Sequence, residues 1–141
     1  MKDIDYIQLI QAALDARKKA YTPYSNFQVG AALLTADGEI YGGCNIEYAS
    51  YGASNCAERT AFFRAIFDGK HDFSAIAIVG GKAGGPLGKA YPCGICRQVM
   101  AEFCDLETFE VIVAASEDDY EVYRLKEILP CAFTPASLEN E

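Results

Sequence analysis

The chain has 141 residues, of which 51% are hydrophobic and 23% are charged, a composition typical of a folded globular protein and not of a disordered or fibrous one. Its formal net charge of -8, without a Lys/Arg cluster, argues against a nucleic-acid groove, because phosphate binding depends on concentrated positive charge. The length predicts a single domain over residues 1–141, and the lack of a long apolar run predicts a cytoplasmic protein that makes no membrane contact.

The first predicted elements are a helix and a β-hairpin. Apolar residues at helical spacing predict an amphipathic helix over residues 4–18, which ends before Pro23. Apolar runs over residues 27–35 and 39–45 flank Ala36-Asp37-Gly38, a turn sequence typical of hairpins. We therefore expect the first two strands to be antiparallel neighbours.

Helices and strands alternate in the rest of the chain. Asn55, followed by Glu58 three residues later, resembles a capping box and predicts a helix that stops at Asp68-Gly69. A glycine-rich loop over residues 80–91 precedes Pro92, which suits the first turn of a second helix. Further strands are predicted over residues 73–79, 109–115 and 120–125, and a short docking segment over residues 128–138. This order predicts a three-layer α/β/α sandwich around a five-stranded mixed sheet.

Three of the six cysteines have the spacing of metal ligands. Cys93 and Cys96 are separated by two residues, so both thiolates of one helical turn can bind one ion, and Cys56 at the start of the other helix can complete the set. Three protein ligands with a position left for water are typical of a catalytic zinc site. The remaining cysteines are interpreted as buried small hydrophobic residues: Cys44, Cys104 and Cys131.

Glu58 is interpreted as a proton shuttle and not as a fourth ligand, because zinc held by three thiolates needs no further anion. Helix N-termini would offset the negative charge of the sulfurs, and Arg59 could donate to them. Arg59 and Arg97, both in first helical turns, favour sulfur or carboxylate partners. Zinc bound by three cysteines beside a non-ligand Glu is the arrangement known in zinc deaminases.

Two motifs closely resemble the homotetrameric, zinc-dependent cytidine deaminase family: Cys56-Ala57-Glu58-Arg59-Thr60-Ala61 and Pro92-Cys93-Gly94-Ile95-Cys96-Arg97-Gln98. Further similarity follows in that family's order through residues 23–32, 43–47, 102–103 and 129–133. The resemblance implies a cytidine deaminase-like fold and hydrolytic deamination of free cytidine and 2'-deoxycytidine in pyrimidine salvage. It also implies one Zn²⁺ ion per subunit and a homotetramer.

Taken residue by residue, the resemblance implies that Cys56, Cys93 and Cys96 bind zinc and that Glu58 is the catalytic residue. Phe27 would pack on the pyrimidine ring, while Asn45 and Glu47 would bind the ribose hydroxyls. The other residues implied at the substrate pocket are Ala57, Tyr51 and Phe133, the last two partly across subunit interfaces.

Other interpretations stay open at this point. Cys93 and Cys96 alone would suit a thioredoxin-like redox pair, and a structural zinc module would need a fourth ligand and leave Glu58 without a role. Blasticidin S deaminases share the zinc motifs. Phe27 alone is more typical of a core residue. The loop that ends at Tyr91 is longer and richer in glycine than the family pattern, which leaves the tolerance of modified cytosines open.

Overall fold

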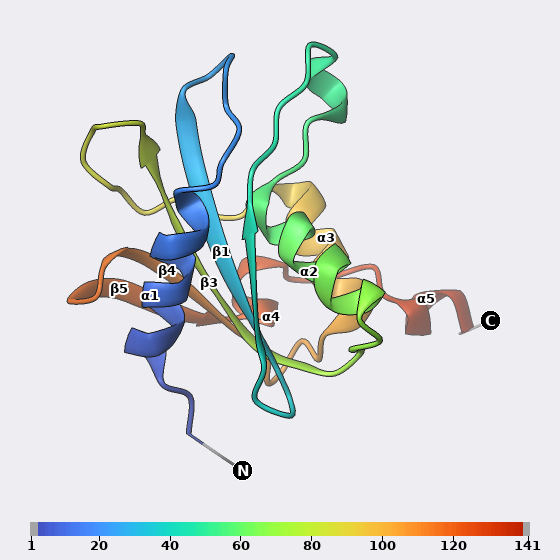
Figure 1. Ribbon diagram of the computed structural model, residues 1–141. Coiled ribbons are helices and arrows are strands. Elements are labelled where there is room, and N and C mark those ends of the chain that lie inside the picture. The colour runs from blue at the N-terminus through green and yellow to red at the C-terminus, as the bar shows by residue number, and fades with distance from the viewer. Residues whose placement is uncertain (1–2, 140–141) are drawn as a thin grey trace.

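The computed structural model describes residues 3–139, which form one five-stranded sheet with helices on both faces (Figure 1). The strands are β1 (Phe27–Thr35), β2 (Ile40–Cys44), β3 (Phe73–Lys82), β4 (Glu110–Ser116) and β5 (Asp119–Arg124). The helices are α1 (Tyr6–Arg17), α2 (Ala57–Phe67), α3 (Gly94–Phe103), α4 (Leu125–Ile128) and α5 (Pro135–Glu139), with a 3-10 turn at Tyr51–Ala53.

The strand order across the sheet is β2-β1-β3-β4-β5. Strand β1 is antiparallel to both β2 and β3, β3 is parallel to β4, and β5 returns antiparallel beside β4. The parallel pair is joined through α3, as a crossover between parallel strands requires. The predicted mixed sheet and α/β/α layering are therefore confirmed.

The core is divided by the alternation of side chains along the central strands. Ile76 and Ile78 of β3 pack toward α2 and α3, whereas Ala77 and Val79 pack on the opposite face toward α1. Phe62 of α2 is fully buried in the first of these layers. Because strand side chains alternate with a period of two, each buried strand serves both layers.

Two glycines allow helices to lie directly on strand backbones. A Cβ on Gly30 of β1 would lie 2.1 Å from the backbone oxygen of Ala13 in α1. A Cβ on Gly43 of β2 would lie 2.4 Å from the backbone oxygen of Ala57, the first residue of α2. The absence of a side chain at Gly43 therefore allows the start of α2 to pack directly against β2.

The start of α2 differs from the prediction. Its N-cap is Cys56 and not Asn55, and the Asn55 amide donates to the hydroxyl of Thr60 at 2.9 Å. Glu58 is only 4% exposed, so it points inward instead of returning to cap the helix. The predicted capping box is wrong because burial of Glu58 outweighs the local capping preference.

The start of α3 also differs. Its N-cap is Cys93, so Pro92 lies ahead of the helix and not in its first turn. Strand β3 continues to Lys82, three residues beyond its predicted end, and shortens the predicted loop. Within residues 3–139, no helix is both long and apolar enough to cross a membrane.

Candidate active site and metal centre

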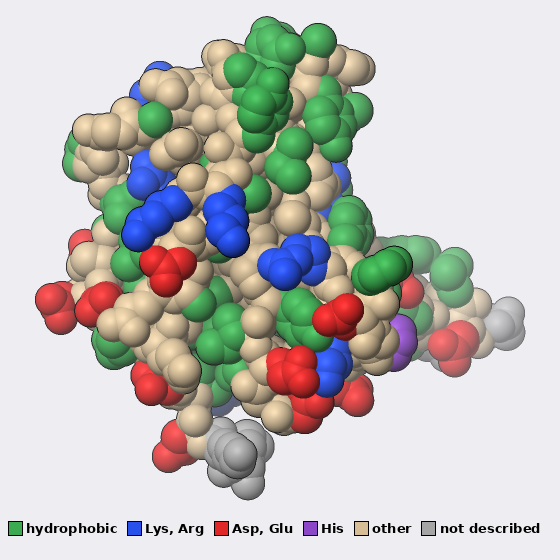
Figure 2. Space-filling model, in the orientation of Figure 1, with side chains coloured by type: hydrophobic (Ala, Val, Ile, Leu, Met, Phe, Trp, Pro, Cys, Tyr) green, Lys and Arg blue, Asp and Glu red, His purple; other side chains and the backbone are tan. Residues whose placement is uncertain are grey.

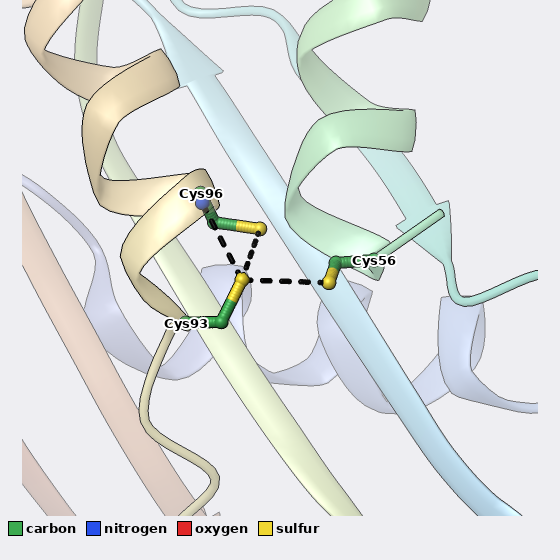
Figure 3. Close-up of side chains that lie close together, drawn as sticks. All are labelled: Cys56, Cys93 and Cys96. Atoms are coloured by element: carbon green, nitrogen blue, oxygen red, sulfur yellow. Dashed lines mark hydrogen bonds between the residues drawn. The ribbon is translucent and has the colours of Figure 1, made fainter. Parts of the chain in front are cut away.

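Three cysteines from two helix starts meet at one point. The Sγ of Cys93 lies 3.7 Å from that of Cys56 and 3.5 Å from that of Cys96 (Figure 3). All three sulfurs lie within 4.8 Å of one another. Cys56 and Cys93 are the N-caps of α2 and α3, and Cys96 is in the first turn of α3. Both helix N-termini, with their partial positive charge, are thus next to the sulfur cluster.

The sulfur cluster fits a zinc ion. Zn–S bonds of about 2.3 Å at tetrahedral angles place sulfurs roughly 3.8 Å apart. The observed separations of 3.7 and 3.5 Å are close to that value, and far above the ~2.05 Å of a disulfide. Between residues 3 and 139, no fourth Cys, His, Asp or Glu joins the group. Three donors are the number of a catalytic zinc site, whereas a structural site has four.

Arg59 supplies positive charge to the cluster. Its Nη2 donates to the Sγ of Cys56 at 3.4 Å, which is the sulfur partner expected from the sequence. A hydrogen bond with Cys96, supported by Arg59 and Cys93, lowers the pKa of the Cys56 thiol to about 5. The same hydrogen bond, with burial, raises the pKa of the Cys96 thiol. Both shifts arise because the two sulfurs lie close together.

Glu58 lies in the first turn of α2, two residues after Cys56, and its side chain is buried. Burial, followed by the negative charge of Cys56, raises the pKa of the Glu58 carboxyl to about 7. A carboxyl group with this pKa can both accept and donate a proton near neutral pH.

A second group of predicted residues lies at the start of β1. The Asn45 amide nitrogen donates to the carbonyl of Phe27 at 2.8 Å, and its oxygen accepts from the N–H of Val29 at 2.9 Å. The Glu47 carboxylate accepts from the N–H of Ser25 at 3.1 Å and from the Ser25 hydroxyl. These bonds lower the pKa of Glu47. Both side chains therefore fix the entry to β1, a role that was not predicted from the sequence.

The two groups lie side by side through backbone pairing. Ile46 and Asn55 exchange two hydrogen bonds of 2.9 Å, which places Asn45–Glu47 beside the segment that ends in Cys56. The Phe27 ring is 39% exposed and borders a cavity of about 390 Å³ that the loop of residues 86–90 also lines. The polar side chains of Asn45 and Glu47 therefore lie near the segment that supplies Cys56, and Asn45 links that segment to Phe27.

The remaining predicted pocket residues differ in their surroundings. The side chain of Ala57 is buried in the core, so this residue offers only its backbone to a ligand. Tyr51 is 69% exposed and packs edge-on against Tyr24, with ring centroids 5.2 Å apart. Phe133 is 58% exposed, and its carbonyl accepts from the Gln98 amide at 2.8 Å. The rings of Tyr51 and Phe133 project from the surface of the single chain.

Two predictions about individual side chains are wrong. Cys131 is exposed, and Cys44 and Cys104 are only partly buried, so the three cysteines are not all core residues. Arg97 has neither a sulfur nor a carboxylate partner among residues 3–139. It donates instead to the carbonyls of Pro92 at 2.8 Å and Ile128 at 2.6 Å. Backbone carbonyls at chain turns satisfy this guanidinium, and sequence spacing does not reveal them.

Comparison with known proteins identifies a family model that covers most of the chain. Residues 4–114 match the model described as "Cytidine and deoxycytidylate deaminase zinc-binding region". A cytidine deaminase of Sporosarcina psychrophila is 47% identical over 135 residues, which is 96% of each chain. A cytidine deaminase of Halalkalibacterium halodurans is 48% identical over 138 residues, which is 97% of this chain and 100% of the relative.

Solved structures give the same result. The crystal structure of a cytidine deaminase from Burkholderia pseudomallei matches with a TM-score of 0.83 and 48% identity, over 92% of this chain and 100% of that one. A cytidine deaminase from Mycobacterium tuberculosis matches with a TM-score of 0.80 and 37% identity, over 93% and 98% of the two chains. The similarity therefore extends over nearly the whole of these relatives.

Proposed function

The chain belongs to the cytidine and deoxycytidylate deaminase family of zinc enzymes, and from this premise we propose that it hydrolyses free cytidine and 2'-deoxycytidine to the corresponding uridines and ammonia. One observation carries the proposal. Glu58 is buried in the first turn of α2, the helix whose N-cap is Cys56. Its carboxyl group lies beside a cluster of three sulfurs that has no fourth protein ligand among residues 3–139.

The metal would be held by Cys56, Cys93 and Cys96, with one zinc ion per chain. When bound, the ion supplies the Lewis acidity that activates water for attack on C4 of the base. Three thiolates leave a negative centre around a divalent cation. Arg59 and the N-termini of α2 and α3 offset that charge.

Glu58 is the proposed carrier of protons. Its carboxylate takes a proton from the attacking water and delivers it to ring nitrogen N3. It then moves the remaining proton of that water, from the hydroxyl group now on C4, to the 4-amino group as the bond between C4 and the amino nitrogen breaks. One water is consumed, C4 becomes a carbonyl carbon, and ammonia leaves. Because the side chain is 4% exposed, its proton passes to the substrate and not to bulk water.

Phe27, Asn45 and Glu47 are the proposed contacts of the nucleoside, with the ring of Phe27 against the base. The Asn45 amide nitrogen uses one of its two N–H groups on Phe27, and one Glu47 oxygen accepts only from the Ser25 hydroxyl among the described residues. Both side chains keep hydrogen-bonding capacity for sugar hydroxyls. Once a bound nucleoside covers them, polar groups of this kind discriminate strongly against analogues that leave them unpaired.

Assembly into a homotetramer is part of the proposal. Figure 2 shows hydrophobic side chains gathered over the tip of the molecule, where the α1–β1 and β2–α2 connections lie. Exposed aromatic residues of these connections are Tyr21, Tyr24, Tyr48 and Tyr51. Such patches are typical of protein interfaces. Six free cysteines also fit a reducing cytoplasm, where an enzyme of nucleoside salvage would meet its substrate.

A direct assay tests the function. Purified, zinc-loaded protein is incubated separately with cytidine and 2'-deoxycytidine, and the loss of the cytosine absorption band is followed together with the release of ammonia. We expect ammonia and the uracil nucleoside in equal amounts from both substrates. Zinc-bound protein that turns over neither nucleoside would refute the proposal.

A further inference from the structure

The segment between β3 and α3 leaves the sheet as a wide loop before it returns to the metal cluster (Figure 1). Residues 83–91 include three glycines, so much of this loop has little intrinsic stiffness. The cavity of about 390 Å³ between the loop and Phe27 also shows that packing does not fill the space beneath it. Specific contacts must therefore hold the loop in place.

Backbone hydrogen bonds from Ala83 to Asn26 and from Gly88 to Gly80 hold the earlier part of the loop, and side-chain contacts hold the end nearest the metal cluster. The Tyr91 hydroxyl donates to Oε1 of Glu121 on β5 at 2.7 Å, and Lys89 lies 2.9 Å from Oδ1 of Asp119 and 3.7 Å from Oε2 of Glu121. Tyr123 donates to the same Oε1 atom at 2.5 Å, and its ring centroid is 6.3 Å from that of Tyr91. We call Lys89, Tyr91 and Glu121 the β5 latch.

The β5 latch differs from an ordinary surface ion pair. An isolated, exposed ion pair contributes little, because solvent screens it and long side chains lose freedom. Here one carboxylate receives two tyrosine hydroxyls, and hydrogen bonds to an ionised acceptor are roughly twice as strong as neutral ones. The tyrosine arm is also rigid, having only two side-chain torsions.

The position of Tyr91 makes the contact relevant to the metal. Cys93 follows two residues later, is exposed, and precedes the first turn of α3, whereas Cys96 is buried within that helix. On the helix side, Arg97 holds the carbonyl of Pro92 at 2.8 Å. Among the contacts made by the loop, those of the β5 latch lie closest to Cys93 in sequence.

We propose that Tyr91, Lys89 and Glu121 are positioning residues that tie the segment before α3 to the edge strand β5 and thereby hold Cys93 in place for the metal. The inference rests on the proposed function, because it takes Cys93 as a zinc ligand. It adds that residues on a strand remote from α2 and α3 in sequence set the affinity of the site. Groups around a ligand commonly tune metal affinity in this way.

Two matched variants test the inference. Tyr91→Phe and Tyr123→Phe each remove one hydroxyl from the same Glu121 oxygen, but only the first lies on the loop. The zinc affinity of each full-length protein is measured by competition with a chromophoric chelator, and the cobalt-substituted protein is examined by absorption spectroscopy. We expect Tyr91→Phe to weaken zinc binding by about three- to tenfold and to weaken the thiolate-to-cobalt band. Tyr123→Phe should bind as the parent does.

A conservative change and a mobility measurement complete the test. Glu121→Gln keeps an acceptor for Tyr91, so it should retain more affinity than Glu121→Ala. Hydrogen exchange at residues 83–91 should accelerate in Tyr91→Phe and not in Tyr123→Phe. Equal zinc affinity in the parent and Tyr91→Phe would overturn the latch, whereas failure of the parent to bind zinc would overturn the proposed function.

Discussion

The guanidinium of Arg59 donates a hydrogen bond from Nη2 to the Sγ of Cys56 at 3.4 Å. Cys56 is the N-cap of α2 and Arg59 is three residues further on, so one helical turn brings the cation back to the sulfur. The pair shows how the start of one helix can supply a metal ligand, its charge compensation and, in Glu58 between them, a proton carrier.

Replacement of Arg59 by Gln should weaken zinc binding by about tenfold, because the thiolates lose their nearest positive side chain. Competition with a chromophoric chelator measures this change. Arg64→Gln is the matched control, since Arg64 is on the same helix and donates to the carbonyl of Gly42 instead. Equal losses in the two variants would show that net charge, and not the contact with Cys56, is responsible.

Replacement of Glu58 by Gln should lower turnover by about 10²- to 10⁴-fold while zinc remains bound, because the amide keeps the shape of the side chain and cannot carry the proton. Steady-state kinetics and zinc content are measured on the same preparation. Glu102→Gln, an exposed position on α3, should behave as the parent. Undiminished turnover in Glu58→Gln would rule out the proposed mechanism.

Replacement of Phe27 by Ala should raise KM for cytidine by about tenfold with a smaller effect on kcat, since stacking of a base on an aromatic ring stabilises the bound substrate by about 1–3 kcal/mol. The kinetic constants are compared with those of Phe67→Ala, whose ring is 92% exposed at the end of α2. An unchanged KM would assign Phe27 a role in packing alone.

Replacement of Gly43 by Ala should cost about 1–3 kcal/mol of stability, because the added Cβ would lie 2.4 Å from the backbone oxygen of Ala57 and α2 must move. Zinc affinity should fall as well, since Cys56 moves with the start of α2. Gly42→Ala is the control, because its Cβ would lie 3.3 Å from the Ala16 Cβ and no closer than 4.0 Å to a backbone atom. Urea unfolding measures the stability of both variants, and equal stabilities would contradict the expectation.

The hydrogen bond of Tyr6 predicts that the protein loses stability at alkaline pH. Its hydroxyl donates to Oε1 of Glu110 at 2.6 Å, and this hydrogen bond, with burial, raises the pKa of Tyr6 to about 12. Because the folded-state pKa exceeds the unfolded value near 10, the contribution is complete below about pH 10 and is lost as the pH rises toward 12. The stability difference between the parent and Tyr6→Phe should therefore shrink over that interval in urea unfolding. A constant difference would show that this hydrogen bond does not govern the titration.

Much of the fold could be predicted because its signals are local. The continuous apolar run around Ile76 and the turn at Gly38 are each recognised within a few positions, and the structure has a strand and a hairpin there. The predicted start of α2 failed for the same reason. Local spacing favours a capping role for Glu58, whereas burial against the rest of the fold decides its direction.

The sequence by itself determined which cysteines are candidates for the metal, because Cys93 and Cys96 need only one helical turn to meet. Only the tertiary structure decided that the sulfur of Cys56 lies within 4.8 Å of the other two, that Asn45 is bonded to the β1 backbone, and that Tyr91 reaches Glu121 thirty residues away. The physical reason is that such contacts depend on strand order and register. These are fixed by burial summed over the whole core and not by any single segment.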